Sequence, residues 1–152
     1  MVKVMATGTF DLLHLGHVYY LQEAKKLGDK LVVVVATDTT VRRLKHEPIN
    51  PGEIRLNLIK QFRMVDEAYL GYDDDMYRIV EEIKPDIIAL GYDQIHDENK
   101  IKDELKKRKI DAKIVRLPEY KKGSDLNGTR RIIQKIISAY EFQKQMERIE
   151  RK

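Results

Sequence analysis

The stretch TGTFDLLHLGH, residues 7–17, decides the fold of this chain, because it lies between a segment with strand character and one with helix character. Residues 3–6 before it are mostly apolar, as in a buried strand, and residues 18–27 carry apolar side chains at helical spacing. Gly28 follows this second segment and is typical of a helix end. The sequence therefore predicts that residues 7–17 form a strand-to-helix turn.

The same turn has the features of a phosphate-binding site. The N-terminus of a helix presents unpaired backbone N–H groups and a partial positive charge, both of which attract an anion. Gly8 and Gly16 would let the backbone approach a phosphate, and His14 and His17 would add two side-chain donors. Isolated loop histidines are more often solvated or structural, but here two of the chain's four histidines flank one glycine. We therefore predict a site for nucleotide phosphates.

Apolar runs and helical patterns alternate along the rest of the chain, which indicates a parallel sheet covered by helices. The strands are expected at residues 3–6, 31–36, 68–70, 87–90 and 113–117. The helices are expected at residues 18–27, 52–63, 76–83, 98–108 and 128–148, the last followed by a basic tail. We predict an α/β fold: a Rossmann-like, doubly wound, mainly parallel five-stranded sheet with helices on both faces.

A doubly wound sheet places its ligand at the carboxyl ends of the strands, near the point where the strand order reverses. Polar segments follow four of the expected strand ends, at residues 7–17, 37–38, 91–94 and 118–129. We expect these four loops to converge on one crevice.

Two helix starts can be predicted from capping residues. Asn50 is expected to cap the second helix, with Pro51 in the first helical position and Glu53 reaching back to the cap. The acidic run 73–75 is expected to cap the third helix and favour its dipole instead of binding a metal.

Length and composition limit the possible functions. The chain has 152 residues, 42% of them hydrophobic, which suits a single domain over residues 1–152. It has no cysteine, which excludes disulfides, a thiol nucleophile and cysteine-based metal sites and is consistent with a cytoplasmic protein. No apolar stretch approaches the roughly 20 residues that cross a bilayer. The net charge is +4, but basic and acidic residues are interspersed and aromatics are sparse, so neither nucleic-acid nor membrane binding is indicated.

The pattern of residues 7–17 resembles the H-x-G-H signature of the nucleotidyltransferase superfamily, in its cytidylyltransferase-like branch. The resemblance extends over residues 3–132, with further family segments in the expected order at residues 27–33, 36–38, 55–67 and 90–93. It implies an enzyme that transfers a nucleoside monophosphate from a triphosphate to a phosphorylated acceptor and releases pyrophosphate. It also implies Mg²⁺ held largely by the triphosphate, with no dedicated metal residue.

The resemblance implies roles for individual residues. His14, His17, Lys45 and Arg55 are expected to be catalytic. The residues expected to bind the nucleotide are Thr7, Gly8, Thr9, Phe10, His14, Gly16, His17, Gly91, Tyr92, Asp93, Asn127, Gly128, Thr129 and Arg130. Asp11 and Asp38 are expected to bind the acceptor, with loop support as the alternative role of Asp11.

The last family segment, residues 117–132, departs from the family pattern. An arginine of the pattern is missing, with the pair Lys121–Lys122 nearby, and the pair Asn127–Gly128 stands where hydroxyl residues are expected. Thr129 and Arg130 keep a hydroxyl and a positive charge at a helix N-terminus.

Two activities within the branch fit this sequence. Archaeal-type FAD synthases adenylylate FMN with ATP, whereas glycerol-3-phosphate cytidylyltransferases use CTP and tend to carry a tryptophan that this chain lacks. Residues 90–94 and the altered last segment are more similar to the first type, so we favour ATP and FMN. A non-catalytic nucleotide-binding module is the alternative from another class, and the joint presence of both histidines, Arg55 and Thr129 argues against it.

Relatives of this type are commonly homodimers, so we expect a homodimer that binds small-molecule substrates. The helix expected at 52–63 offers an apolar stripe for the dimer contact: Ile54, Leu58, Ile59 and Phe62.

Overall fold

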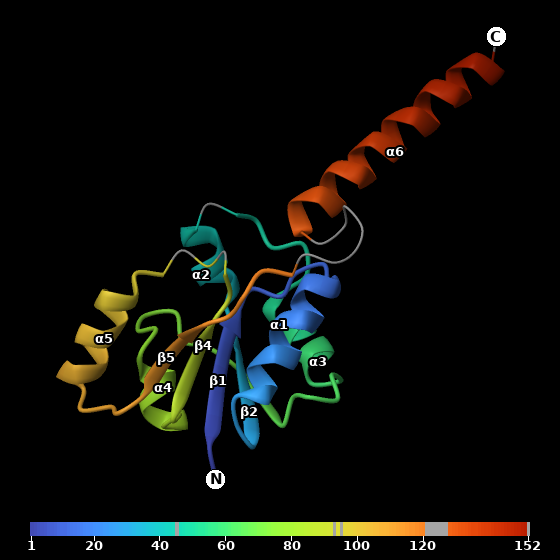
Figure 1. Ribbon diagram of the computed structural model, residues 1–152. Helices are drawn as coiled ribbons and strands as arrows, with labels where there is room; N and C mark the ends of the chain where they lie inside the picture. Colours follow the sequence, from blue (N-terminus) through green and yellow to red (C-terminus); the bar gives the residue numbers. More distant parts are fainter. Residues whose placement is uncertain (45, 93, 95, 121–127, 152) are drawn as a thin grey trace.

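The protein folds around a parallel five-stranded sheet with the strand order β3-β2-β1-β4-β5 (Figure 1). The computed structural model describes residues 1–152 except 45, 93, 95, 121–127 and 152. The strands are β1 (Lys3–Gly8), β2 (Lys30–Val35), β3 (Glu67–Leu70), β4 (Ile87–Leu90) and β5 (Lys113–Arg116). The helices are α1 (Leu15–Lys26), α2 (Asp38–Arg43), α3 (Gly52–Ile59), α4 (Arg78–Ile83), α5 (Glu98–Lys107) and α6 (Thr129–Glu150).

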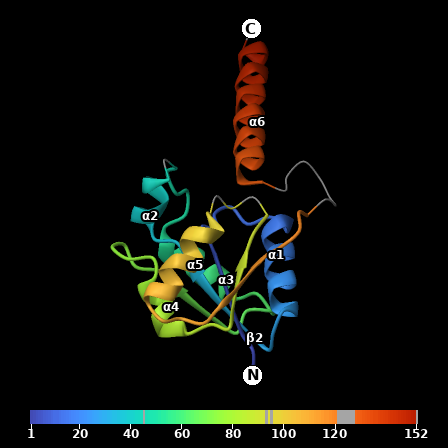
Figure 2. The ribbon, with the colours of Figure 1, turned by 60° about the vertical axis from the view of Figure 1, so that its left-hand side comes forward.

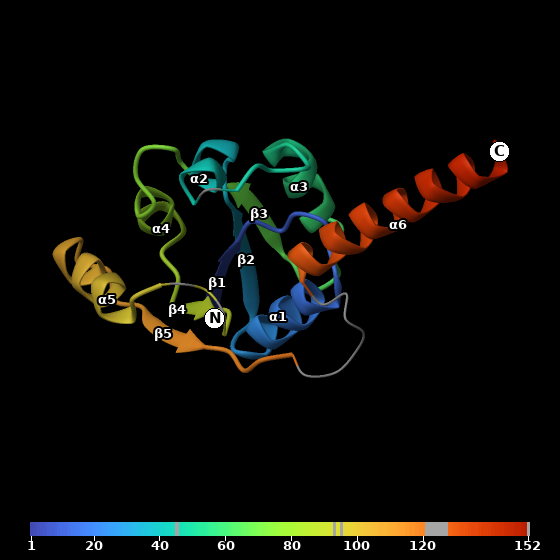
Figure 3. The same cartoon turned by 90° about the horizontal axis from the view of Figure 1, so that it is seen from above.

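Helices cover both faces of the sheet. Val4 of β1 belongs to a buried cluster with Leu21 of α1 and Ile59 of α3. The next residue, Met5, belongs to a second cluster that includes side chains from α4 and α5: Ile79, Val80, Ile83 and Leu105. Seen from above, α1 and α3 lie on one side of the sheet and α4 and α5 on the other (Figure 3). The predicted doubly wound α/β fold is confirmed.

The turn after β1 is shorter than the sequence predicts. β1 continues to Gly8 because its parallel register with β2 extends to the pair Gly8–Val35. The first helix also begins early, since His14 is the N-cap and Leu15 the first residue of α1. The strand-to-helix turn therefore comprises only residues 9–14.

The loop after β2 contains a short helix, α2, that the sequence pattern does not predict. Its threonines are β-branched, and such residues lower helix propensity. Thr37 nevertheless caps this helix, because its hydroxyl accepts a hydrogen bond from the backbone N–H of Thr40 at 3.2 Å.

The expected caps of the next two helices differ in the structure. Asn50 does not cap α3; the backbone N–H of Gly52 donates instead to Oδ1 of Asp38, at 3.0 Å. Asp38 belongs to α2, so this contact depends on a helix that the sequence does not reveal. The N-cap residue of α4 is Tyr77, and its side chain makes no capping hydrogen bond. Of the acidic run 73–75, Asp75 accepts a hydrogen bond from the backbone N–H of Tyr77 at 3.0 Å, just before the helix.

The apolar stripe expected on α3 is divided between core and surface. Ile59 is fully buried and Phe62 packs against the core. Only Ile54 and Leu58 face solvent, with exposures of 48% and 42%. The stripe is therefore mainly a core feature, and two of its four residues are available to a partner.

α6 stands away from the body of the protein (Figures 1 and 2). None of its 22 residues is buried. Its base is tied to the turn after β1, because Oγ1 of Thr129 donates to the backbone carbonyl of Asp11 at 2.9 Å. Within the described part of the chain, neither α6 nor any other helix is long and apolar enough to span a membrane.

Candidate functional site

A pocket of 1220 Å³ lies between the carboxyl ends of the strands and the base of α6. The loops after β1, β2, β4 and β5 all contribute to it, as the topology predicts. Most residues expected at the site line this pocket: Thr7, Gly8, Thr9, Phe10, Asp11, His14, Gly16, His17, Gly91, Tyr92, Gly128, Thr129 and Arg130. Arg55 and Asp38 are not among its lining residues, and Lys45, Asp93 and Asn127 lie outside the described residues.

The two signature histidines lie against each other at the start of α1, with ring centroids 3.8 Å apart. Nδ1 of His14 accepts a hydrogen bond from the backbone N–H of Gly16 at 3.1 Å. Nδ1 of His17 accepts one from the backbone N–H of His14 at 3.3 Å. A neutral imidazole that accepts at Nδ1 carries its proton on Nε2. Each ring is therefore held as an Nε2–H donor in a fixed orientation.

Burial lowers the pKa of His17 to about 3, and the neighbouring His14 acts in the same direction. His17 is therefore uncharged at neutral pH. It can donate a hydrogen bond to a phosphate oxygen, but it brings no positive charge to the site.

We expect His17 to remain neutral through the range from about pH 5 to 8 in which histidines usually titrate. Its folded-state pKa lies below the ordinary value of 6.5, so below that pH the unfolded chain binds a proton that the folded protein does not. His17 therefore lowers the free energy of unfolding progressively as pH falls from about 6.5 towards about 3. NMR of ¹³C-labelled histidine would follow the ring resonance that disappears in His17→Ala, and a titration midpoint near 6.5 would contradict this expectation.

Phe10 supports His17 from the core. Its side chain is only 2% exposed, and its ring centroid lies 5.5 Å from that of His17. A Cβ atom on Gly8 would come within 2.8 Å of the Phe10 ring. The sequence explains Gly8 by the approach of a phosphate, but in the structure a side chain at this position is excluded by the packing of Phe10.

Asp11 holds the loop that precedes α3. It is 6% exposed, and its carboxylate accepts hydrogen bonds from the backbone N–H groups of Leu12, Ile49 and Asn50 at 3.1, 2.6 and 3.1 Å. A carboxylate that already accepts hydrogen bonds from three backbone N–H groups is not available to bind the acceptor substrate. Of its two expected roles, the structure favours loop support.

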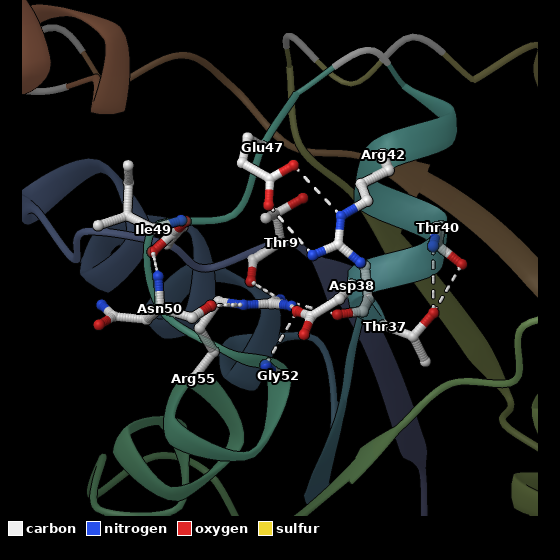
Figure 4. Close-up of polar contacts among 12 residues, drawn as sticks. Thr9, Thr37, Asp38, Thr40, Arg42, Glu47, Ile49, Asn50, Gly52 and Arg55 are labelled. Atoms are coloured by element: carbon white, nitrogen blue, oxygen red, sulfur yellow. Dashed lines mark hydrogen bonds and ion pairs between the residues drawn. The ribbon is translucent and has the colours of Figure 1, made fainter.

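Arg55 is fully buried below the pocket, with 0% of its surface exposed. Its guanidinium donates to the backbone carbonyls of Thr9, Ala36 and Asn50 at 2.8, 2.7 and 2.8 Å (Figure 4). Its Nη2 also donates to Oδ1 of Asp38 at 2.7 Å. One side chain thus joins the turn after β1, the end of β2, α2 and the loop before α3.

These contacts change the roles of two expected site residues. Arg55 has no exposed surface and does not line the pocket, so its burial and hydrogen bonds favour a positioning role over the expected catalytic one. Asp38 holds Arg55 and the first backbone N–H of α3, so the structure does not support its expected contact with the acceptor.

Sequence reasoning assigned no role to two residues that hold the loop after β4. Gln94 accepts a hydrogen bond from the backbone N–H of Gly91 at 2.9 Å and donates to the carbonyl of Thr7 at 2.7 Å. Arg116 of β5 donates to the carbonyls of Gly91 and Gln94 at 2.9 and 3.1 Å. Gln94 lies in a segment with family resemblance, which is a usable signal. No spacing in the sequence marks Arg116, because its partners are set by the pairing of β4 with β5.

The pocket can bind and orient a polyphosphate. Its histidines supply fixed neutral donors, and Arg130 supplies a positive charge at the first turn of α6. The Thr129 hydroxyl donates a hydrogen bond to the Asp11 carbonyl, so it ties the base of α6 to the turn after β1. Among the described residues there is no group of three His, Asp or Glu side chains that could hold a metal ion. Mg²⁺ bound by a triphosphate needs no such group, because the phosphates and water molecules supply most of its ligands.

Comparisons with known proteins agree with this geometry. Residues 5–141 match the model of the cytidylyltransferase-like family. The FAD synthase of Aciduliprofundum boonei is 59% identical over 90% of this chain and 91% of its own length, and that of Methanothermus fervidus is 56% identical over 87% and 92%. A crystal structure from Thermoplasma volcanium, described as a lipopolysaccharide core biosynthesis protein, has a TM-score of 0.77 and 53% identity, covering 79% of this chain and 98% of that one. The chain belongs to the cytidylyltransferase-like family.

Proposed function

We propose that this protein transfers the adenylyl group of ATP to FMN and so forms FAD and pyrophosphate. The observation that carries this proposal is the identity of 59% and 56% to FAD synthases over most of both chains. The size of the site also supports it. Pockets for one small ligand measure about 300 to 1,000 Å³, and this pocket of 1220 Å³ is larger, as two substrates require.

We place the two substrates on opposite sides of the histidines. β1 lies between β2 and β4 in the sheet, so the loops after β4 and β5 meet the pocket on one side and α2 with its following loop on the other. The first side, with Gly91 and Leu117, is assigned to the adenosine of ATP. The second side presents Leu44 and Ile49, which are 61% and 56% exposed. Such an apolar surface suits the planar isoalloxazine ring of FMN.

The reaction needs no nucleophile from the enzyme. A phosphate oxygen of FMN forms a bond to the α-phosphorus of ATP while the bond between that phosphorus and the α,β-bridging oxygen breaks, and pyrophosphate leaves. His14 and His17 would donate from Nε2 to the phosphate oxygens on which charge develops. Because both rings are already fixed through Nδ1, these donors need no reorganisation during the reaction.

The remaining expectations stay predictions. Mg²⁺ is expected to enter the site with ATP and to neutralise part of the triphosphate charge. Lys45 is expected to reach the phosphates, but it lies outside the described residues. The single domain over residues 1–152, the cytoplasmic location and the homodimer also remain to be tested.

Purified protein with Mg²⁺ is expected to form FAD and pyrophosphate from ATP and FMN. The test compares all four combinations of ATP or CTP with FMN or glycerol 3-phosphate, with products separated by chromatography. Highest turnover with ATP and FMN is the expected result. Faster turnover with CTP and glycerol 3-phosphate would replace the proposed activity by the cytidylyl transfer weighed from the sequence, and pyrophosphate from none of the four pairs would contradict both.

A further inference from the structure

α6 carries an apolar stripe that the described part of the chain leaves mostly exposed, with only Ile132, at the base of the helix, partly buried. Ile132, Ala139, Phe142, Met146 and Ile149, with Lys135, recur at alternating spacings of three and four residues. This is the a and d pattern of a coiled-coil seam. Phe142, Met146 and Ile149 are 64%, 40% and 59% exposed. We call these six residues the α6 stripe.

The α6 stripe is distinct from the side of the helix that faces the pocket. Ile133 lines the pocket and lies one residue away from the stripe. Ile137 lies roughly opposite the stripe on the helix and is also exposed, at 51%. The helix therefore offers both a candidate interface and, on its far side, a matched apolar position for a control.

The α6 stripe is complementary to itself in the antiparallel direction. When two copies run antiparallel with a positions against d positions, Ile132 lies opposite Ile149 and the small Ala139 lies opposite the large Phe142. The remaining pair is Lys135 with Met146, where the aliphatic part of lysine can cover the methionine while its ammonium reaches water. Every member of the stripe thus receives a compatible partner.

The charges on α6 favour the same direction. Residues 129–140 contain three basic and no acidic side chains, whereas residues 141–150 contain three acidic and two basic ones. A parallel pair would bring the two basic halves together. An antiparallel pair places each basic half against the more acidic half of the other helix and opposes the two helix dipoles.

We propose that two copies of this chain pair through α6, antiparallel, along the α6 stripe. The tip of each helix then lies beside the base of the other, along a side of α6 that is distinct from the pocket-facing side with Ile133. This pairing does not depend on which nucleotide or acceptor the site uses.

Sedimentation equilibrium of the full chain at micromolar concentration tests whether two copies pair through the α6 stripe. The wild type is expected to be a dimer, and the double variant Phe142→Lys/Met146→Lys a monomer with unchanged circular dichroism. Two controls should remain dimeric: Ile137→Lys, on the far side of α6, and Ile54→Lys/Leu58→Lys, on the exposed part of α3. A monomeric wild type, or a dimer that is lost in the α3 variant and kept in the α6 stripe variant, would overturn the proposal.

Disulfide trapping tests whether the two α6 helices run antiparallel. The sequence contains no cysteine, so every disulfide formed must come from the introduced residues. Ile132→Cys and Ile149→Cys are prepared separately and then mixed under mild oxidation, with one chain carrying a size tag. Antiparallel pairing predicts a disulfide between the two different chains and little within either variant alone. Disulfides formed mainly within each variant alone would show a parallel pair and overturn the antiparallel arrangement.

Discussion

Replacing His17 by Ala is expected to lower kcat by roughly 10² to 10³, the effect of removing one fixed donor that stabilises transition-state charge. The structure supports this size of effect because the ring is oriented by the backbone N–H of His14 and lines the pocket. The donor is neutral, since the pKa of His17 is about 3, so the loss should be similar across the pH range in which the enzyme is folded. Steady-state kinetics of FAD formation measures it.

Two comparisons separate catalysis from folding. His46→Ala removes another histidine that lines the pocket but lies outside the signature turn at residues 7–17, and it should change kcat far less. His14→Ala should lower activity and also stability, because the His14 side chain caps α1 and loss of a cap costs about 1 kcal/mol. Near-normal turnover of His17→Ala, or inactivity explained by its unfolding, would contradict the role assigned to the signature.

Replacing Arg55 by Met is expected to have the largest effect on stability, with the free energy of unfolding lowered by about 3 to 5 kcal/mol. The substitution removes a buried cation, leaves the carbonyls of Thr9, Ala36 and Asn50 without the guanidinium that donates to them, and breaks the ion pair with Asp38. Denaturant unfolding followed by circular dichroism measures the change.

Arg42→Met is the matched control for this variant. Arg42 also pairs with a carboxylate, that of Glu47 at 3.1 Å, but both side chains are exposed (Figure 4). Exposed ion pairs contribute about 0 to 1 kcal/mol, so this substitution should barely change the unfolding curve. Equal effects of Arg42→Met and Arg55→Met would show that Arg55 does not connect the loops as described.

The sequence predicts the sheet and the place of the site because both depend on local patterns. The run Leu31–Val35 is apolar throughout and becomes a buried strand in the interior of the sheet. Residues 7–17 carry glycine and histidine at a strand end, and the structure places His14 and His17 in the pocket that the topology requires. Periodicity along one segment is sufficient for such predictions.

The roles of the supporting residues depend on partners that are distant in sequence, and local patterns do not contain them. Asp11 holds backbone groups of the loop at 49–50, and Arg55 holds Thr9 and Ala36. Family resemblance marks Asp11 and Arg55 as important, but only burial and hydrogen bonds show that they position loops. The same limit applies to Asn50, whose expected capping role is taken by a side chain of α2.

Transfer of label from [α-³²P]ATP tests the proposed chemistry most directly. With FMN and Mg²⁺, the label is expected in FAD, while label from [γ-³²P]ATP is expected in pyrophosphate. In His17→Ala both products should appear together at a rate roughly 10² to 10³ lower. Label from [α-³²P]ATP found in free AMP or ADP and absent from FAD would contradict adenylyl transfer to FMN at this site.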